Sequence, residues 1–149
     1  MRLTVATLVA LTLVAACAPK EEAPVDSPAA AAAPAAPTIA DFAGTWNIAS
    51  ILEGTPDTVK STLSGTADGT FTMTLEGRPN IPVTVSMSGD SLIGQSAEYE
   101  SVLRKGVMVT VRTASVMSNG QLMGNLEATY KAPTGTQVVK GTLTGSRAP

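Results

Sequence analysis

The stretch Gln121–Tyr130, QLMGNLEATY, decides the fold of this 149-residue chain. Apolar or small residues occupy its even positions, from Leu122 to Tyr130, whereas polar residues dominate its odd positions. A period of two residues is typical of a β-strand that buries one face and exposes the other to water. The stretch therefore predicts a half-buried strand, and the rest of the chain can be compared with it.

The same alternation recurs along the C-terminal three quarters of the chain. Asp68-Gly69 and Asn119-Gly120 are strong signals for tight hairpin turns between such strands. Short connections make sequential strands antiparallel neighbours, and closing the sheet removes its exposed edges. The pattern therefore predicts an all-β fold, a small eight-stranded antiparallel meander barrel. The expected strands lie near residues 42–52, 58–67, 70–76, 81–88, 91–99, 107–117, 121–131 and 136–147.

The N-terminus predicts export. Arg2 precedes an apolar run, Leu3 to Ala16, that is shorter than the ~20 residues of a membrane-spanning helix and typical of a secretory signal. The run ends in Val14-Ala15-Ala16-Cys17, which resembles the lipobox of bacterial lipoproteins. The resemblance implies cleavage before Cys17, so that residues 1–16 are the signal peptide, and acylation of Cys17 by chains such as palmitate.

Lipidation explains why the only cysteine stands at this position. Cys17 has no partner for a disulfide within the chain, and acylation consumes its thiol. Each buried CH₂ contributes ~0.8 kcal/mol, so several chains hold a protein firmly at a membrane. Ala18 replaces the aspartate that marks inner-membrane retention in enterobacteria, which favours the outer membrane. The alternative is a plain signal peptide with an incidental cysteine.

Residues 17–37 comprise the lipidated cysteine and an Ala- and Pro-rich linker. The segment lacks apolar periodicity, and its prolines oppose a packed element, so we expect it to be disordered. Residues 38–149 remain as one domain, the predicted barrel.

The first predicted strand adds a second resemblance. Gly44-Thr45-Trp46 resembles the Gly-x-Trp motif that opens the lipocalins, within the wider calycin group. In that family the tryptophan lies at the closed end of the barrel and packs against a basic residue from the last strand. Arg147 matches that residue here. The resemblance implies a structural, barrel-closing role for Gly44, Trp46 and Arg147, in which the guanidinium covers the indole face.

Several function classes lose support from composition. The chain has no histidine, which removes the commonest general base and metal ligand. Gly89-Asp90-Ser91-Leu92 spells a hydrolase signature, but we interpret it as a hairpin turn because that family needs a distant histidine. The net charge is −2, without a basic stripe for nucleic acid. We therefore expect no enzyme, no metal, no cofactor and no nucleic-acid partner.

Binding or scaffolding remains. The residues predicted to line the interior are Met73, Leu75, Val85, Met87, Leu122, Leu126, Tyr130 and Leu143. One hypothesis is an envelope lipoprotein whose barrel binds a small apolar ligand, which predicts an internal cavity of at least ~300 Å³. The alternative is a structural or protein-interaction lipoprotein, including an inhibitor of a secreted enzyme, with a filled barrel and an exposed apolar patch. Val102, Leu103 and Arg104 are candidates for that patch, although we expect them to continue the strand at 91–99.

Overall fold

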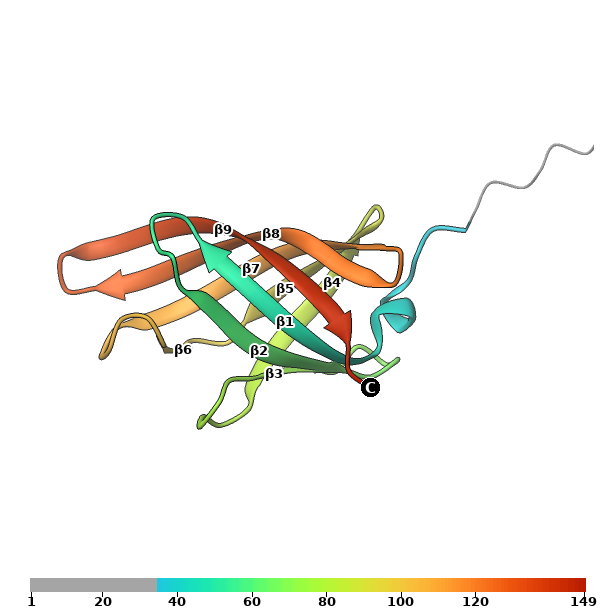
Figure 1. Cartoon of the computed structure of the whole chain (residues 1–149), viewed down its shortest axis with the longest axis horizontal. Coiled ribbons are helices and arrows are strands. Elements are labelled where there is room, and N and C mark those ends of the chain that lie inside the picture. Colours follow the sequence, from blue (N-terminus) through green and yellow to red (C-terminus); the bar gives the residue numbers. More distant parts are fainter. Residues whose placement is uncertain (1–34) are drawn as a thin grey trace, which may run out of the picture. The chain divides into compact units, whose positions relative to one another are not determined.

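The computed structural model describes residues 35–149, whose strands wrap around a shared interior (Figure 1). The predicted signal peptide, Cys17 and almost all of the predicted linker lie outside the described residues. Within residues 35–149, no helix is long and apolar enough to span a membrane. The elements are the 3-10 helix η1 (Ile39–Phe42) and the strands β1 (Gly44–Leu52), β2 (Thr58–Gly65), β3 (Phe71–Thr74), β4 (Ile81–Ser88), β5 (Ser91–Ser96), β6 (Tyr99–Glu100), β7 (Met108–Ser118), β8 (Gln121–Ala132) and β9 (Gly135–Arg147).

Antiparallel pairing joins eight of these strands into a closed barrel. The order is β1-β2-β3-β4-β5-β7-β8-β9, and β9 returns to pair with β1 from Trp46↔Arg147 to Leu52↔Gly141. The predicted all-β, eight-stranded antiparallel meander is therefore confirmed. Closure pairs the first and last strands of residues 35–149, so the barrel has no free outer strand at that seam.

One predicted strand was wrong in detail. The segment expected at 91–99 divides into β5, which ends at Ser96, and the two-residue β6, which pairs with the start of β7. The β5–β7 register ends at Gln95↔Arg112. At the next position the amide of Val111 donates to the Ser96 hydroxyl, at 2.8 Å, instead of to a backbone carbonyl. A side chain thus replaces the ladder bond, and the regular β5–β7 pairing ends there.

The core consists of two clusters, one toward each end of the barrel. Both clusters consist mainly of the side chains that point inward from alternate positions of the strands. Burying each large apolar side chain contributes roughly 1.5–3 kcal/mol to the free energy of folding. The cluster at the end with η1 contains Phe42, Trp46, Phe71, Leu92 and Leu122. The cluster at the opposite end contains Leu52, Val109, Leu126, Ala128, Tyr130 and Leu143.

Gly141 is required where β9 passes β1. A Cβ added there would overlap the carbonyl oxygen of Ile51 and come 3.0 Å from the Leu52 Cα. Both atoms belong to backbone, which cannot rotate away as a side chain can. A side chain at this position would therefore push the two closing strands apart.

We predict that Gly141→Ala lowers the free energy of unfolding by about 1–3 kcal/mol, because it overpacks the β1–β9 seam. Urea denaturation measures the change. Thr142→Ala is the matched control, since Thr142 is exposed on the same strand and its loss should change stability by less than ~0.5 kcal/mol. Equal stability of the two variants would contradict this account of the seam.

Candidate functional site

Two adjacent cavities lie inside the barrel wall. The loop-side chamber has a volume of about 50 Å³ and lies beside the loop that follows β6. The inner chamber has a volume of about 80 Å³ and extends toward the η1 end. Ser50, Ser61, Met73 and Val111 line both chambers and so form the partition between them. Methionine adapts its shape easily, and therefore Met73 makes this partition deformable.

The predicted lining residues are distributed between these two chambers. Met87 alone lines neither chamber and packs instead against the cluster at the η1 end. That any of these residues contacts a ligand stays a prediction. The loop-side chamber contains Met73, Leu75, Leu126 and Tyr130, and the inner chamber contains Met73, Val85, Leu122 and Leu143.

Hydroxyl groups form a second part of the lining, which the sequence interpretation missed. They come from β1, β2, β5 and β7: Ser50, Ser61, Ser96, Thr113 and Ser115. Alternation along the strand could have identified them. Ser50, for example, follows Trp46 and Ile48 at even positions and should therefore point inward as they do. Within residues 35–149, no buried side-chain nitrogen or oxygen lacks a hydrogen-bond partner. The interior therefore offers polar contacts without unsatisfied groups.

The lining carries no ionic group. Among the described residues, no Asp, Glu, Lys or Arg borders either chamber. No group of three or more His, Cys, Asp or Glu within residues 35–149 is placed to hold a metal ion. A buried charge without a partner is strongly unfavourable. The chambers are therefore suited to neutral molecules.

The ligand-binding hypothesis required a cavity of at least ~300 Å³, and the structure does not contain one inside the barrel. The two chambers together stay well below that volume. Large apolar side chains of both core clusters pack inside the barrel and occupy most of its interior. For comparison, an engineered cavity of about 150 Å³ accommodates benzene. The interior as it stands admits only a slender molecule.

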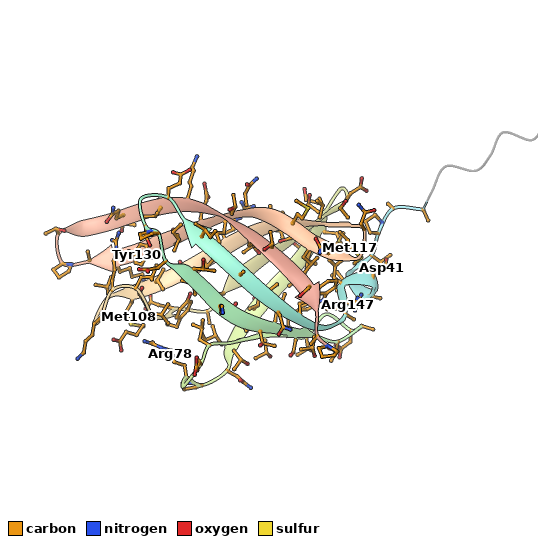
Figure 2. All side chains as sticks on the ribbon, in the orientation of Figure 1. Asp41, Arg78, Met108, Met117, Tyr130 and Arg147 are labelled. Carbon is orange, nitrogen blue, oxygen red and sulfur yellow. The ribbon has the colours of Figure 1, made fainter. Side chains whose placement is uncertain are left out.

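At one end, η1 and Arg147 cover the barrel (Figure 2). Trp46 is fully buried and its indole N–H donates to the Phe42 carbonyl at 2.9 Å. The Arg147 guanidinium lies 4.3 Å from the Trp46 ring centroid. It also donates to the carbonyls of Ala43, at 2.8 Å, and Asp41, at 3.0 Å. These contacts tie the last residue of β9 to the segment that precedes β1.

Gly44 leaves room for this arrangement. Its φ of +116° disfavours any other residue, and an added Cβ would come within 2.7 Å of Arg147 Nη1. The structure thus brings Gly44, Trp46 and Arg147 together, and their barrel-closing role stays a prediction. Nearby, the Asp41 carboxylate accepts bonds from the backbone N–H and the hydroxyl of Thr38. These bonds, the backbone one first, lower the pKa of Asp41.

The opposite end is covered by the loop after β6. The expectation that Val102, Leu103 and Arg104 continue a strand was wrong, because the chain turns at Ser101 after the short β6. Leu103 packs on the core, whereas Val102 is 43% exposed. Arg104 lies 4.1 Å from the Tyr130 ring centroid. Tyr99, beside this loop, has its pKa raised to about 12, chiefly because burial disfavours the phenolate.

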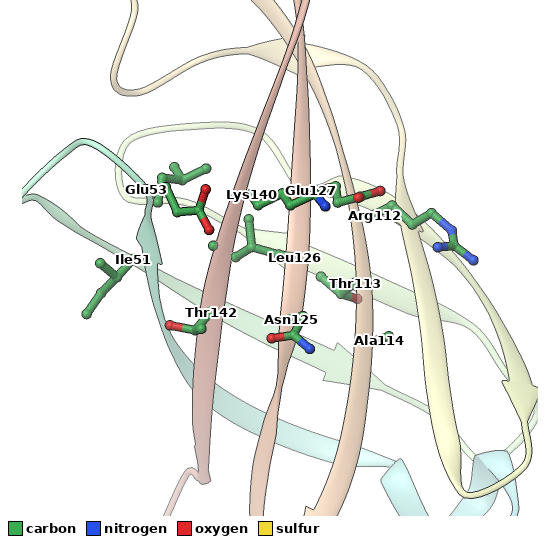
Figure 3. Close-up of a pocket in the computed structure, with 12 residues that line it drawn as sticks. Ile51, Glu53, Arg112, Thr113, Ala114, Asn125, Leu126, Glu127, Lys140 and Thr142 are labelled. Carbon is green, nitrogen blue, oxygen red and sulfur yellow. The ribbon is translucent and has the colours of Figure 1, made fainter.

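Larger hollows lie on the outer face of the wall. One, of about 520 Å³, crosses β1, β9, β8 and β7 (Figure 3). Its charged margin follows the strand register, in which Lys140 faces Glu127 and Glu127 faces Arg112. Another, of about 700 Å³, lies over β1, β2 and β9. Outward-facing side chains supply most of their lining, and a few wall residues, such as Leu126 and Ser61, border both an outer hollow and a chamber.

The chain is similar to the crystal structure of a rhizavidin–biotin complex, with a TM-score of 0.46 and 10% sequence identity. The similarity covers 76% of this chain and 98% of the rhizavidin chain. No protein-family model matches the sequence, and no curated protein matches it.

We predict that Arg147→Ala lowers the free energy of unfolding by about 1–3 kcal/mol, through loss of the cation–π contact and two hydrogen bonds. Arg147→Lys should not restore it, because an ammonium group cannot reproduce the planar, two-pronged contact. Thermal unfolding checks both variants. Arg112→Ala, at an exposed position of β7, is the matched control, and an equal loss there would contradict the assignment.

Proposed function

We propose that this chain is an envelope lipoprotein whose barrel binds a small, neutral, predominantly apolar molecule. The observation that carries the binding function is the pair of adjoining, uncharged chambers inside the barrel. Their apolar side chains favour a hydrocarbon portion, and the inward hydroxyls support one hydrogen-bonding group. A carboxylate or ammonium would lose its hydration with no counter-ion on the lining.

The size of the chambers restricts the ligand further. A volume of about 80 Å³ admits a few carbon atoms, and a longer ligand must cross the partition between the two chambers formed by Ser50, Ser61, Met73 and Val111. A narrow alkyl chain with a terminal hydroxyl meets these requirements. Movement of Met73 would join the chambers and lengthen the ligand that fits.

We predict that 1-hexanol binds in the chambers of the full chain, whereas hexanoate, of equal length but charged, binds at least about tenfold more weakly. Methionine methyl NMR measures both. Hexanol should shift the Met73 resonance, and the exposed Met108 and Met123 should stay unchanged as internal controls. Equal shifts at exposed methionines, or no shift at Met73, would contradict interior binding.

A matched pair of variants locates the ligand. Leu126 is buried and lines the loop-side chamber. Leu126→Phe should fill that space and weaken hexanol binding, whereas Leu126→Met conserves volume and should retain it. Retained affinity in a folded Leu126→Phe protein would place the ligand elsewhere.

A second candidate function is supported by the small cavity volumes. A barrel filled to this degree also suits a structural or protein-interaction lipoprotein. Val116 on β7 and Met123 on β8 are exposed cross-strand partners, and they form an apolar pair on the outer wall. Two results together would favour this function over ligand binding. Neutral probes would fail to bind the barrel, and Met123→Ser would abolish the binding of a protein partner.

The membrane anchor is part of the proposal and rests on the sequence around Cys17. We predict that the mature protein starts at Cys17 and carries acyl chains, and that it fractionates with the outer membrane. Intact-mass analysis of the envelope fraction measures the added mass. Cys17→Ser should abolish acylation and membrane retention, and an unmodified Cys17 in mature, membrane-free protein would contradict the anchor.

A further inference from the structure

The loop Ser101–Val107, hereafter the flap, is held in shape by its own hydrogen bonds. The Ser101 amide donates to the Val107 carbonyl at 2.8 Å, and the Val107 amide donates to Arg104 at 3.1 Å. The Ser101 hydroxyl accepts the amides of Leu103 and Arg104, both at 3.1 Å. Internal bonds of this kind survive if the loop moves as a unit, because none of them joins the flap to the barrel wall.

Two arginines connect the flap to its surroundings. Arg104 reaches from the flap to the β8–β9 hairpin, where it covers the Tyr130 ring and donates to Gln137 Oε1 at 2.6 Å. Arg78, in the turn between β3 and β4, donates to the carbonyls of Glu100 and Ser101, at 2.5 and 3.4 Å. Figure 2 shows Arg78 and Tyr130 at the same end of the barrel. The flap is thus clamped from two directions by side chains.

The flap covers the chamber directly. Ser101, Val102 and Leu103 form part of the lining of the loop-side chamber, and Leu103 packs on the core cluster beneath. The other end offers no comparable route, because Phe42 and Trp46 are fully buried there. Access to the interior is therefore easier under the flap than past η1.

We propose that the flap is the entrance to the barrel interior, and that Arg104 is the clamp that keeps it closed. The role of the flap as an entrance rests on the proposed function, because an entrance needs a ligand. The opening motion itself can be measured without any ligand. When Arg104 leaves Tyr130 and Gln137, the internally bonded flap swings from the chamber, and Leu103 leaves the core. Arg78 limits this motion from the opposite side.

Oxidation of Met73 by hydrogen peroxide measures this opening without any ligand. Met73 and Met87 are both partly buried, but Met73 lines the chambers near the flap and Met87 packs at the η1 end. In the full chain, Arg104→Ala should accelerate Met73 oxidation about tenfold and leave the Met87 rate unchanged. Lys105→Ala is the matched control, because Lys105 is the exposed neighbour of Arg104 on the same flap.

Each outcome decides the proposal. Faster oxidation at Met73 alone supports it, and equal rates in Arg104→Ala and Lys105→Ala overturn it. If Arg104→Ala accelerated the oxidation of both methionines, unfolding would be the cause. Gln137→Ala, which removes one clamp contact and retains the stacking on Tyr130, then decides through the same comparison of Met73 and Met87 oxidation rates. Failure of hexanol to shift Met73 in every variant, with selective Met73 oxidation intact, would refute the proposed function and leave the entrance standing.

Discussion

The pairing of β1 with β9 is the interaction on which the rest of this structure depends. It runs from Trp46↔Arg147 to Leu52↔Gly141 and joins the two ends of the described barrel. Once eight strands close, their number and stagger limit the interior width, and strand parity selects which side chains occupy it. Within that limit, the packing of leucine, methionine and valine side chains leaves only the two small chambers.

An arginine lies over an aromatic ring at each end, but the surroundings differ. At the η1 end, Arg147 lies over a fully buried indole and bonds to two carbonyls of the adjoining chain. At the opposite end, Arg104 belongs to a loop whose other hydrogen bonds are internal, reach it through Arg78, or join Gly106 to the side chain of the adjoining Glu100. The first arrangement joins elements of the wall, and the second fastens a separate unit over the chamber. This difference in attachment is why the two ends have different expected dynamics.

Local patterning was sufficient to predict most of the fold. Alternation in segments such as Gln121–Tyr130, with turns at Asp68-Gly69 and Asn119-Gly120, reports directly on burial and chain reversal, so strand order followed from short connections. The break after Ser96 was not predictable in this way, because it depends on a side chain that replaces a ladder bond across strands. The cavity volume also could not be predicted from the alternation of apolar and polar residues. It depends on how Met73 and its neighbours pack across the barrel, which parity does not determine.

The central claim is that the interior holds a small neutral molecule. Native mass spectrometry of the full chain, isolated from its own envelope without added detergent, tests this most directly. The account predicts a neutral bound mass of low molecular weight that leaves under collisional activation and whose loss restores the mass of the acylated chain. A clean unliganded mass, unchanged after incubation with envelope lipids and short alcohols, would contradict ligand binding and favour a filled barrel that acts through its outer surface.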